Sequence, residues 1–575
     1  MKEGVILGCD KKPDFKTEYI ISVSQRSFSK LQLEVARFIS YYYVSTLGEA
    51  LGLFVPFEEE REQTSQAILF CSPMLTMQQQ EAYKSLIQNK RSLFFGVTGA
   101  GKTEVFIAII SQVLSEGKNG ILLMPEISLT PQMEVRLRFF FKDSVALWHS
   151  KLSKKKKEEI LRDIRSGKVR LIAGARSALF IPLENIGIIV VDEEHDDSYK
   201  AMTKPRYHAR DIALFIGEKS GAKVILASAT PNVTSFYKYP VVRLDTPFVS
   251  TKKTYHFTTG EGLSLPLEQA VLRHFANGGK MLLFVPTRGN FKYLYCPSCG
   301  ATHLCPFCSV GMALHRNNRH LRCHYCGYSE AIIDSCTSCG YTPLSSQRIG
   351  TAELKETINE IFPTLKIEQF DKDTITTHKK LTQALKRFEI GESQMLLGTQ
   401  MLSKGHDYGD ITLAIVMGID YVLGLSDYRA KERAVALLFQ VGGRSGRAKE
   451  AEVWVQTSNQ PLFEEYLGDY GKFIANELEF RKSLGYPPFG FMARIIVTHK
   501  NITKAEEILE QILAILKRYP SLNVLGFGTA PIEKIANNYR FHVVIQTEDR
   551  KTLIHALHEV YFPHVVIDMD PVDFS

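Results

Sequence analysis

Short apolar runs alternate with helical patterns along much of the chain. The runs are apolar throughout, which indicates strands buried on both faces of a parallel sheet. We therefore predict an α/β lobe over residues 63–248, with strands at Ser92–Phe95, Gly120–Met124, Val169–Ala173, Gly187–Val191 and Lys223–Ala227. A second alternation begins near Pro266 and predicts another such sheet, with strands at Lys280–Val285, Leu365–Phe370, Gln394–Leu397, Ile411–Met417 and Glu452–Gln456.

Two further patterns interrupt and follow the second lobe. A cysteine-rich block at residues 294–342 divides that lobe into residues 249–293 and 343–458. Residues 459–575 show a long amphipathic helix, Leu462–Leu484, followed by strand, helix, strand, strand, helix and strand, an order that suits a ferredoxin-like α+β domain. Helices within the second lobe are expected at Thr351–Ile361, Thr376–Glu389 and Asp427–Val441.

One stretch of the first lobe carries a specific chemical signal. Residues 96–103 fit the phosphate-loop pattern G-x-x-x-x-G-K-[ST] and lie between an apolar strand and a helical run, the context that this motif requires. The glycines let backbone amides surround phosphates, the Lys102 ammonium adds positive charge, and the Thr103 hydroxyl can hold Mg²⁺. We expect ATP to be bound by Gly96, Val97, Thr98, Gly99, Ala100, Gly101, Lys102 and Thr103.

A glutamine precedes this loop. Gln79 lies in the polar segment Thr76–Gln80, shortly before the predicted first strand. Its side chain could contact the base of the nucleotide, and the segment is equally consistent with the polar start of a helix. The sequence leaves both interpretations open, and we include Gln79 among the candidate nucleotide contacts.

Acidic and polar residues follow two other predicted strands of the first lobe. Asp192 and Glu193 come directly after the run Ile188–Val191, at the strand end that faces the ligand in a parallel sheet. We expect Asp192 to hold the Mg²⁺ shell and Glu193 to orient and deprotonate the attacking water. His195 and the segment Ser228–Thr230 are expected to sense the γ-phosphate and relay its loss.

Two arginines lie at the end of a predicted helix of the second lobe. Arg444 and Arg447 stand in the run Gln-Val-Gly-Gly-Arg-Ser-Gly-Arg that begins at Gln440, and they share a helical face if the helix persists. From there they can reach the γ-phosphate held by the first lobe and supply charge in the transition state. A basic cap at a helix C-terminus is the alternative. The pair predicts lobes that close on the nucleotide and open after hydrolysis.

Eight of the ten cysteines lie in four C-x-x-C pairs between residues 296 and 339. In a cytosolic chain such pairs indicate a metal rather than disulfides, and Zn²⁺ takes four thiolates in a tetrahedron. We therefore predict two structural zinc sites, with iron–sulfur as the less favoured alternative. Spacing alone does not decide which pairs share an ion, although a nested arrangement would make one compact unit. The expected ligands are Cys296, Cys299, Cys305, Cys308, Cys323, Cys326, Cys336 and Cys339.

Composition sets outer limits on the function. The 575 residues are enough for several domains, and 45% hydrophobic with 23% charged residues is ordinary for a globular protein. No apolar run approaches the ~20 residues that span a bilayer, so we expect no membrane contact and a cytoplasmic location. The net charge of +8 suits a polyanionic partner.

Two polar loops, residues 174–179 and 398–407, could hold a phosphodiester backbone through N–H and hydroxyl groups.

Taken together, these motifs resemble the superfamily 2 helicases, and in detail the primosomal replication-restart helicases. The phosphate loop, the acidic motif at Asp192, the arginine motif at Gln440 and the eight-cysteine block carry the resemblance. It implies two RecA-like helicase lobes with a zinc-binding insertion in the second. It also implies a partial DNA-binding domain at residues 1–62 and a C-terminal one at 459–575. The family's aromatic-rich loop, which couples DNA to ATP hydrolysis, aligns with residues 198–207.

The resemblance further implies a function and a set of partners. The expected protein is an ATP-dependent 3′→5′ DNA helicase that recognises stalled or repaired forks, unwinds DNA and initiates primosome assembly at the nucleoid. Its implied partners are forked and single-stranded DNA, other primosome proteins, the replicative helicase or its loader, and single-strand DNA-binding protein. The alternative is a zinc-bearing DNA-binding scaffold in which ATP acts as a switch. The implied zinc pairing is nested, with Cys296, Cys299, Cys336 and Cys339 on one ion and Cys305, Cys308, Cys323 and Cys326 on the other.

Overall fold

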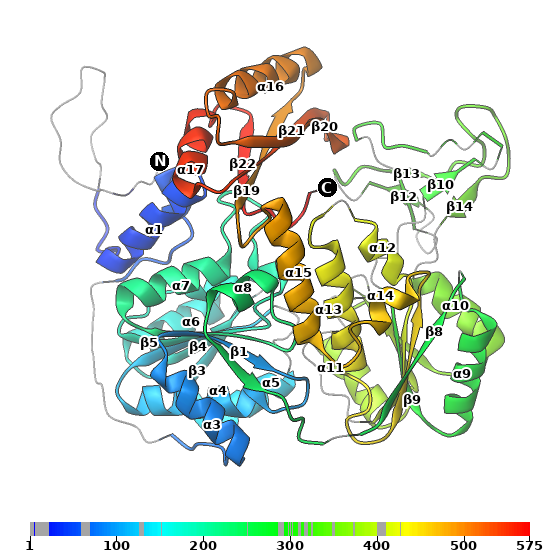
Figure 1. Cartoon of the computed structure of the whole chain (residues 1–575), viewed down its shortest axis with the longest axis horizontal. Helices are drawn as coiled ribbons and strands as arrows, with labels where there is room; N and C mark the ends of the chain where they lie inside the picture. The colour runs from blue at the N-terminus through cyan, green and yellow to red at the C-terminus, as the bar shows by residue number, and fades with distance from the viewer. Residues whose placement is uncertain are drawn as a thin grey trace.

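Two α/β lobes lie side by side, and the C-terminal domain and the cysteine-rich module lie on the same side of the pair (Figure 1). The structure is a computed structural model. Of the predicted features, Thr376, residues 400–407 and most of residues 1–21 lie outside the described residues. The described residues are 5, 22–58, 70–125, 131–150, 152–249, 251–260, 262–285, 293–296, 298–299, 301, 303–308, 312–315, 320–323, 326–347, 351–371, 374–375, 377–399, 410–425 and 427–574.

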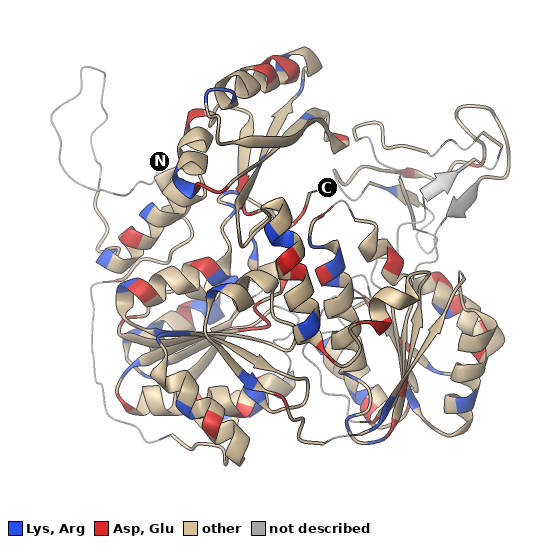
Figure 2. Cartoon of the chain, viewed as in Figure 1, with Lys and Arg blue, Asp and Glu red and all other residues tan. Residues whose placement is uncertain are grey.

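The first lobe is a seven-stranded parallel sheet in the order β3-β4-β2-β5-β6-β1-β7. Its central strands are buried almost throughout, as their apolar runs predict, and charged residues lie mainly on helices and loops (Figure 2). The prediction omits only the edge strands β3 and β7, which have four residues each. The strands are β1 Arg91–Gly96, β2 Asn119–Leu123, β3 Val145–Trp148, β4 Leu171–Gly174, β5 Ile186–Asp192, β6 Lys223–Ser228 and β7 Val241–Leu244. The helices are α3 Met77–Gln88, α4 Lys102–Ser115, α5 Pro131–Phe141, α6 Lys154–Arg165, α7 Ala209–Ser220 and α8 Val233–Lys238.

The second lobe is a six-stranded parallel sheet in the order β15-β16-β9-β17-β18-β8, so the prediction of two parallel-sheet lobes is confirmed. The sequence prediction misses β8, an edge strand whose side chains are mostly half-buried and leave no apolar run. The strands are β8 Lys253–Thr258, β9 Lys280–Phe284, β15 Ile367–Phe370, β16 Met395–Gly398, β17 Ile411–Val416 and β18 Ala451–Gln456. The helices are α9 Leu265–Ala276, α10 Thr351–Ile361, α11 His378–Glu389, α12 Ile419–Leu423 and α13 Ala430–Gly442.

The cysteine-rich block forms a module of its own between β9 and α10. Its five short strands pair antiparallel in the order β13-β12-β11-β10-β14. A small buried cluster of cysteines with Met312 and Leu321 is its core, which is small for independent stability. The strands are β10 Tyr293–Tyr295, β11 Ala313–His315, β12 His320–Arg322, β13 Ser329–Ala331 and β14 Ser345–Gln347.

The C-terminal domain has the predicted ferredoxin-like order of elements, and its antiparallel sheet runs β20-β21-β19-β22. The predicted long helix Leu462–Leu484 is wrong in one respect, since it is two helices, α14 and α15. Gly468 between them has φ 83°, and the Asp469 side chain caps α15 by accepting from the Lys472 amide at 3.0 Å. The elements are α14 Gln460–Glu464, α15 Tyr470–Leu484, β19 Phe491–His499, α16 Ile502–Leu516, β20 Asn523–Ile535, β21 Asn538–Thr547, α17 Arg550–Glu559 and β22 Val565–Met569.

The described N-terminal residues pack between the first lobe and the C-terminal domain. Helix α1, Lys30–Tyr42, stacks Phe38 on Phe215 of α7 with ring centroids 4.2 Å apart, and α2, Leu47–Leu51, follows it. His558 of α17 contacts the Tyr41 carbonyl at 2.8 Å. The buried side chains of all three regions belong to one continuous cluster, so this segment joins the C-terminal domain to the first lobe.

Candidate nucleotide site and cysteine clusters

The phosphate-loop residues form the turn between β1 and α4, so their amides and the helix N-terminus face the same space. Gly101 has φ 82° and is the N-cap of α4. The Lys102 ammonium donates to the Gly96 carbonyl at 2.8 Å. The turn therefore has the backbone that phosphate binding needs, and Thr103 occupies the first turn of the helix behind it.

Gln79 lies behind the phosphate loop, where its side chain is only 2% exposed. Its amide nitrogen donates to the carbonyls of Ala100 and Gly101 at 3.2 and 3.3 Å. Its amide oxygen accepts from the Thr76 backbone at 2.9 Å, which completes a capping box at the start of α3. In this arrangement Gln79 ties α3 to the loop, and a side chain at Gly101 would collide with it.

The acidic motif ends β5 beside the phosphate loop. Burial raises the pKa of Asp192 to about 7, with a further contribution from Glu193. Burial lowers the pKa of Lys102, and the carboxylates of Glu193 and Asp192 oppose that change, so the three groups act on one another. Asp192 and Thr103 offer the oxygen donors that Mg²⁺ prefers, and this donor set fits the ion. Glu193 has φ 48°, a strained conformation for a non-glycine residue.

Two arginines of the second lobe lie beside this group. Arg444 and Arg447 both lower the pKa of Lys102, and Arg444 also lowers that of Asp192, so their charges act across the two lobes. The helix does not persist through them as the shared-face argument requires. Helix α13 ends at Gly442, and both arginines are held in the following turn, where Arg447 donates to the Gly443 carbonyl at 3.1 Å.

The lobes touch directly at the phosphate loop. A Cβ atom built on Gly443 would lie 2.5 Å from Thr98 Oγ1 and 2.8 Å from Thr98 Cβ. Glycine is therefore the residue that lets the end of α13 approach the loop this closely. The arrangement brings the arginine turn of one lobe against the phosphate-binding turn of the other.

A hydrogen-bonded relay also crosses between the lobes. The Gln440 amide donates to Thr230 Oγ1 and contacts His195 Nε2, both at 2.9 Å. Because the amide N–H donates, His195 Nε2 accepts, and its Nδ1–H donates to Ser228 Oγ at 2.7 Å. The predicted relay residues of the first lobe are thus connected to the second lobe through Gln440.

Sequence reasoning missed two buried glutamates that support this site. Glu194 is fully buried and accepts from Arg210, Ser235 and the Asn232 backbone, which ties the acidic motif to α7 and α8. Glu432 of α13 accepts from the Val233 backbone of the first lobe at 2.8 Å. Both glutamates stand among other charged residues in the sequence, so no local pattern marks them as buried.

Glu432 also belongs to a buried ionic network. It accepts from Arg481 of α15 at 2.6 Å, and Arg481 in turn pairs with Glu477 at 2.9 Å. Helices α13 and α15 lie next to each other (Figure 1), and both carry charged residues (Figure 2). The network joins both lobes to the C-terminal region at the site where the lobes meet.

The loop aligned with the family's aromatic-rich loop is held by the C-terminal domain. The buried Lys200 ammonium pairs with Asp568 of β22 at 2.9 Å, and Arg206 pairs with the same carboxylate at 2.9 Å. From the second lobe, Arg433 pairs with Asp197 at 2.9 Å. The loop directly follows the acidic motif, so the second lobe and the C-terminal domain both contact a segment continuous with the nucleotide site.

The eight cysteines group into two sets of four, each with all sulfurs within 4.8 Å of one another. The outer cluster is Cys296, Cys299, Cys336 and Cys339, and the inner cluster is Cys305, Cys308, Cys323 and Cys326, which is the nested arrangement. Sulfur separations include 3.5 and 3.7 Å in the outer cluster and 3.6 Å in the inner one. Four ligands at ~2.3 Å from Zn²⁺ lie about 3.8 Å apart, whereas a disulfide needs ~2.05 Å, so both clusters fit zinc.

Known protein families match three parts of the chain. The DEAD/DEAH box helicase family matches residues 76–238. The PriA DNA helicase Cys-rich region (CRR) domain matches residues 305–330, and the Primosomal protein N C-terminal domain matches 482–572. None of the helices in the described part of the chain has the length and hydrophobicity of a membrane span.

Two parallel-sheet lobes that meet at a phosphate loop, with a DEAD/DEAH box match in the first, define a helicase. The chain is 39% identical to the replication restart protein PriA of Helicobacter pylori (strain J99), over 99% of this chain and 93% of that protein. It is 35% identical to replication restart protein PriA of Bacillus subtilis (strain 168), over 84% of this chain and 64% of that protein. The chain belongs to the PriA family of replication restart proteins.

A solved structure is also similar. RecG bound to a three-way DNA junction matches with a TM-score of 0.44 and 15% identity, over 77% of this chain and 50% of that one.

Proposed function

We propose that this protein is an ATP-dependent DNA helicase that moves 3′→5′, unwinds stalled or repaired replication forks and initiates primosome assembly. The observation that carries the proposal is the meeting of the lobes at the phosphate loop. Gly443 lies against Thr98, and the charges of Arg444 and Arg447 act on Lys102. A nucleotide bound there would contact both lobes, so its hydrolysis would change the affinity of one lobe for the other.

The proposed roles follow from the position of each side chain. The phosphate loop and Lys102 bind the β- and γ-phosphates. Thr103 and Asp192 would hold Mg²⁺, which would supply positive charge beside these phosphates. Glu193 orients the attacking water and accepts its proton. Arg444 and Arg447 supply positive charge as negative charge develops on the transferred phosphoryl group.

Coupling to DNA is proposed to run through two connections. The Gln440–His195–Ser228 relay joins the second lobe to the acidic motif, and the loop 198–207 joins the acidic motif to the C-terminal domain. The proposed partners are forked and single-stranded DNA, other primosome proteins, the replicative helicase or its loader, and single-strand DNA-binding protein. With chromosomal DNA as the substrate, we place the protein in the cytoplasm at replication forks.

The test is unwinding of labelled forks by the purified protein, with Lys102→Ala as the variant. We expect Lys102→Ala to abolish both ATP hydrolysis and unwinding, whereas Lys84→Ala, an exposed lysine on α3, leaves both unchanged. Duplexes with only a 3′ or only a 5′ single-stranded tail test direction, and only the 3′ tail should support unwinding. Normal unwinding of forks by Lys102→Ala would contradict the motor proposal. If Lys102→Ala loses ATP hydrolysis but still supports primosome assembly, the alternative of a scaffold with ATP as a switch is favoured.

A further inference from the structure

The β20–β21 hairpin of the C-terminal domain ends against the cysteine-rich module. Its two tip residues, Ala536 and Asn537, have φ 47° and 62°. Tight two-residue turns need these angles and usually place Asn and Gly there, so alanine is an unusual choice at the first position. A non-glycine residue persists in this conformation where its surroundings hold it.

The surroundings of the tip are the residues of the inner cysteine cluster. The Ala536 N–H donates to Cys308 Sγ at 3.1 Å, and the next N–H, that of Asn537, donates to the Phe307 carbonyl at 2.8 Å. The Ile535 side chain packs against the buried cluster that contains Cys305, Cys308 and Cys323. Three consecutive residues of one domain therefore contact the cysteine cluster of another.

The first of these hydrogen bonds has a chemical consequence. Four thiolates around Zn²⁺ leave a net charge of −2, and N–H donors to the sulfurs stabilise that charge and fix the ligand geometry. In the outer cluster, Cys336 accepts from the Ser338 amide at 3.4 Å, a donor from the same short turn. Cys308 of the inner cluster accepts from an amide 228 residues away in the chain.

We propose that the hairpin tip completes the inner zinc site, so that zinc binding there and docking of the C-terminal domain on the module stabilise each other. The tip residues are positioning residues, because they act through Cys308 and do not bind the ion. The outer zinc site has its donor within the module and is independent of the hairpin.

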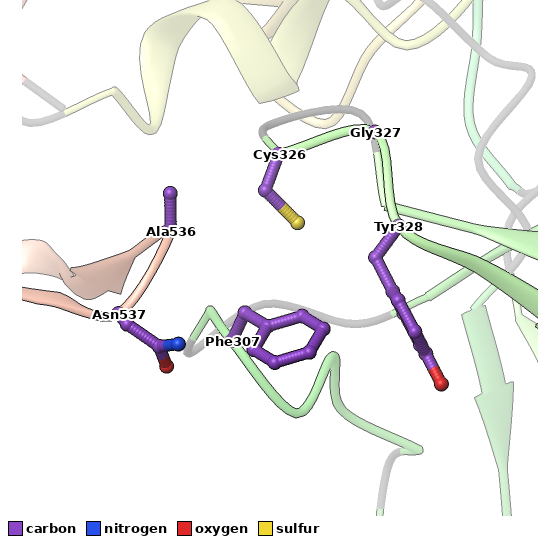
Figure 3. Close-up of a pocket in the computed structure, with 6 residues that line it drawn as sticks. All are labelled: Phe307, Cys326, Gly327, Tyr328, Ala536 and Asn537. Atoms are coloured by element: carbon purple, nitrogen blue, oxygen red, sulfur yellow. The ribbon is translucent and has the colours of Figure 1, made fainter.

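The contact is small enough to be reversible. The hairpin tip and the module line an open pocket of about 440 Å³, formed by Phe307, Cys326, Gly327, Tyr328, Ala536 and Asn537 (Figure 3). Side chains of the two domains line this space without filling it, and the described residues contact one another here through two hydrogen bonds and the packing of Ile535. A junction of this kind can open when the C-terminal domain moves, and opening removes a donor from Cys308.

The test measures zinc release from the full chain to a chromophoric chelator after a thiol-blocking reagent is added. Ala536→Pro removes the N–H and cannot adopt φ 47°, whereas Asn537→Gly keeps both donors and favours the observed turn. Each protein should hold two zinc ions per chain and release them in two phases. We expect Ala536→Pro to accelerate one phase about tenfold and leave the other unchanged, in line with the effect of a lost outer-shell partner. Asn537→Gly should match the unaltered protein.

Two further variants assign the phases and guard against misfolding. Cys299→Ser removes an outer ligand, so the zinc that remains is the inner one and identifies its phase. Ile535→Ser keeps the turn but weakens its apolar contact, and should accelerate the inner phase several-fold. Because coupling is reciprocal, Cys323→Ser should speed amide hydrogen exchange at Ala536 and Asn537.

Release of both ions at unaltered rates from Ala536→Pro and Ile535→Ser, or equal acceleration of both phases, overturns the proposal. A chain that binds no zinc at the inner cluster overturns it as well. Neither result affects the helicase proposal, which rests on hydrolysis and unwinding at the nucleotide site.

Discussion

Gly443→Ala offers a direct test of lobe closure, because it adds one methyl group where the lobes touch. Gly443 has φ −69° and ψ −15°, so alanine meets no backbone strain there. Its Cβ would lie 2.5 Å from Thr98 Oγ1 and 2.8 Å from Thr98 Cβ, well inside the ordinary contact distance of roughly 3.5–4.0 Å. Overpacking of this kind costs about 1–3 kcal/mol. The same Cβ would lie 2.9 Å from the Phe439 carbonyl of its own lobe, a contact that is present whether or not the lobes touch. The contacts with Thr98 exist only when the lobes touch, so closure should become roughly 5- to 150-fold less favourable.

The assay is ATP hydrolysis stimulated by single-stranded DNA, measured over a range of ATP concentrations. We expect kcat/KM for ATP to fall by a factor within that range, while the variant remains folded and unfolds in a cooperative thermal transition. Gly424→Ala is the matched control. It also lies at a helix C-terminus of the second lobe, with φ −78°, and its Cβ would meet only carbonyl oxygens at 3.5 and 3.8 Å.

Normal hydrolysis by Gly443→Ala would refute the reasoning, since it would mean that the reactive state does not bring Gly443 against the phosphate loop. Equal losses in Gly443→Ala and Gly424→Ala would also contradict it, because the cause would then be a general effect of alanine at helix ends. A stable, folded variant with reduced hydrolysis alongside an unaffected control is the expected pattern.

Three further predictions concern the buried polar groups around the site. Glu432→Leu leaves the buried Arg481 guanidinium without one partner, and should cost about 3–5 kcal/mol of stability, seen as a lower unfolding temperature; an unchanged temperature contradicts this. Asp568→Asn removes the charge partner of buried Lys200 and should increase proteolytic cleavage within residues 198–207, while equal protection counts against a role for the pair. Burial lowers the pKa of His208 to about 3. Between pH 6.5 and 3 the unfolded chain therefore binds more protons than the folded chain at this histidine. The free energy of unfolding should fall as pH falls through that range, by at most about 1.4 kcal/mol per pH unit. His208→Asn keeps a helix-capping side chain and should show a shallower decline in denaturant unfolding between pH 6.5 and 4.5; identical slopes exclude the histidine.

Local patterns predicted the features that depend on neighbouring residues in the chain. Strands buried on both faces, such as β5 and β6, are apolar at nearly every position and are readable from sequence alone. The sequence prediction missed strand β8 because an edge strand is only half covered and needs no apolar run. The break in the predicted helix Leu462–Leu484 depends on Gly468, whose left-handed conformation costs little and is signalled only by the residue type.

The pattern of apolar and polar residues along the chain could not predict contacts between distant segments. The sequence placed Arg444 and Arg447 at the end of a helix and left a basic cap open as an alternative, whereas their action on Lys102 depends on how two lobes pack. Gln79 shows the same limit. Its residue type allowed a contact with the base, and only the packing of α3 on the loop placed its amide against the Ala100 and Gly101 carbonyls.

By itself the sequence determined the chemistry of this protein: a phosphate loop, an acidic motif at a strand end, and eight thiols in pairs suited to zinc. Those signals are local, because each comes from a few residues joined by short stretches of backbone. The spacing of the cysteines left their pairing open, and the structure shows the nested pairing that the family resemblance implied. Only the tertiary structure decided that Gly443 meets Thr98 and that Ala536 donates to Cys308. These contacts join segments far apart in the chain, and side-chain packing across several elements fixes them at once, so no local pattern records them.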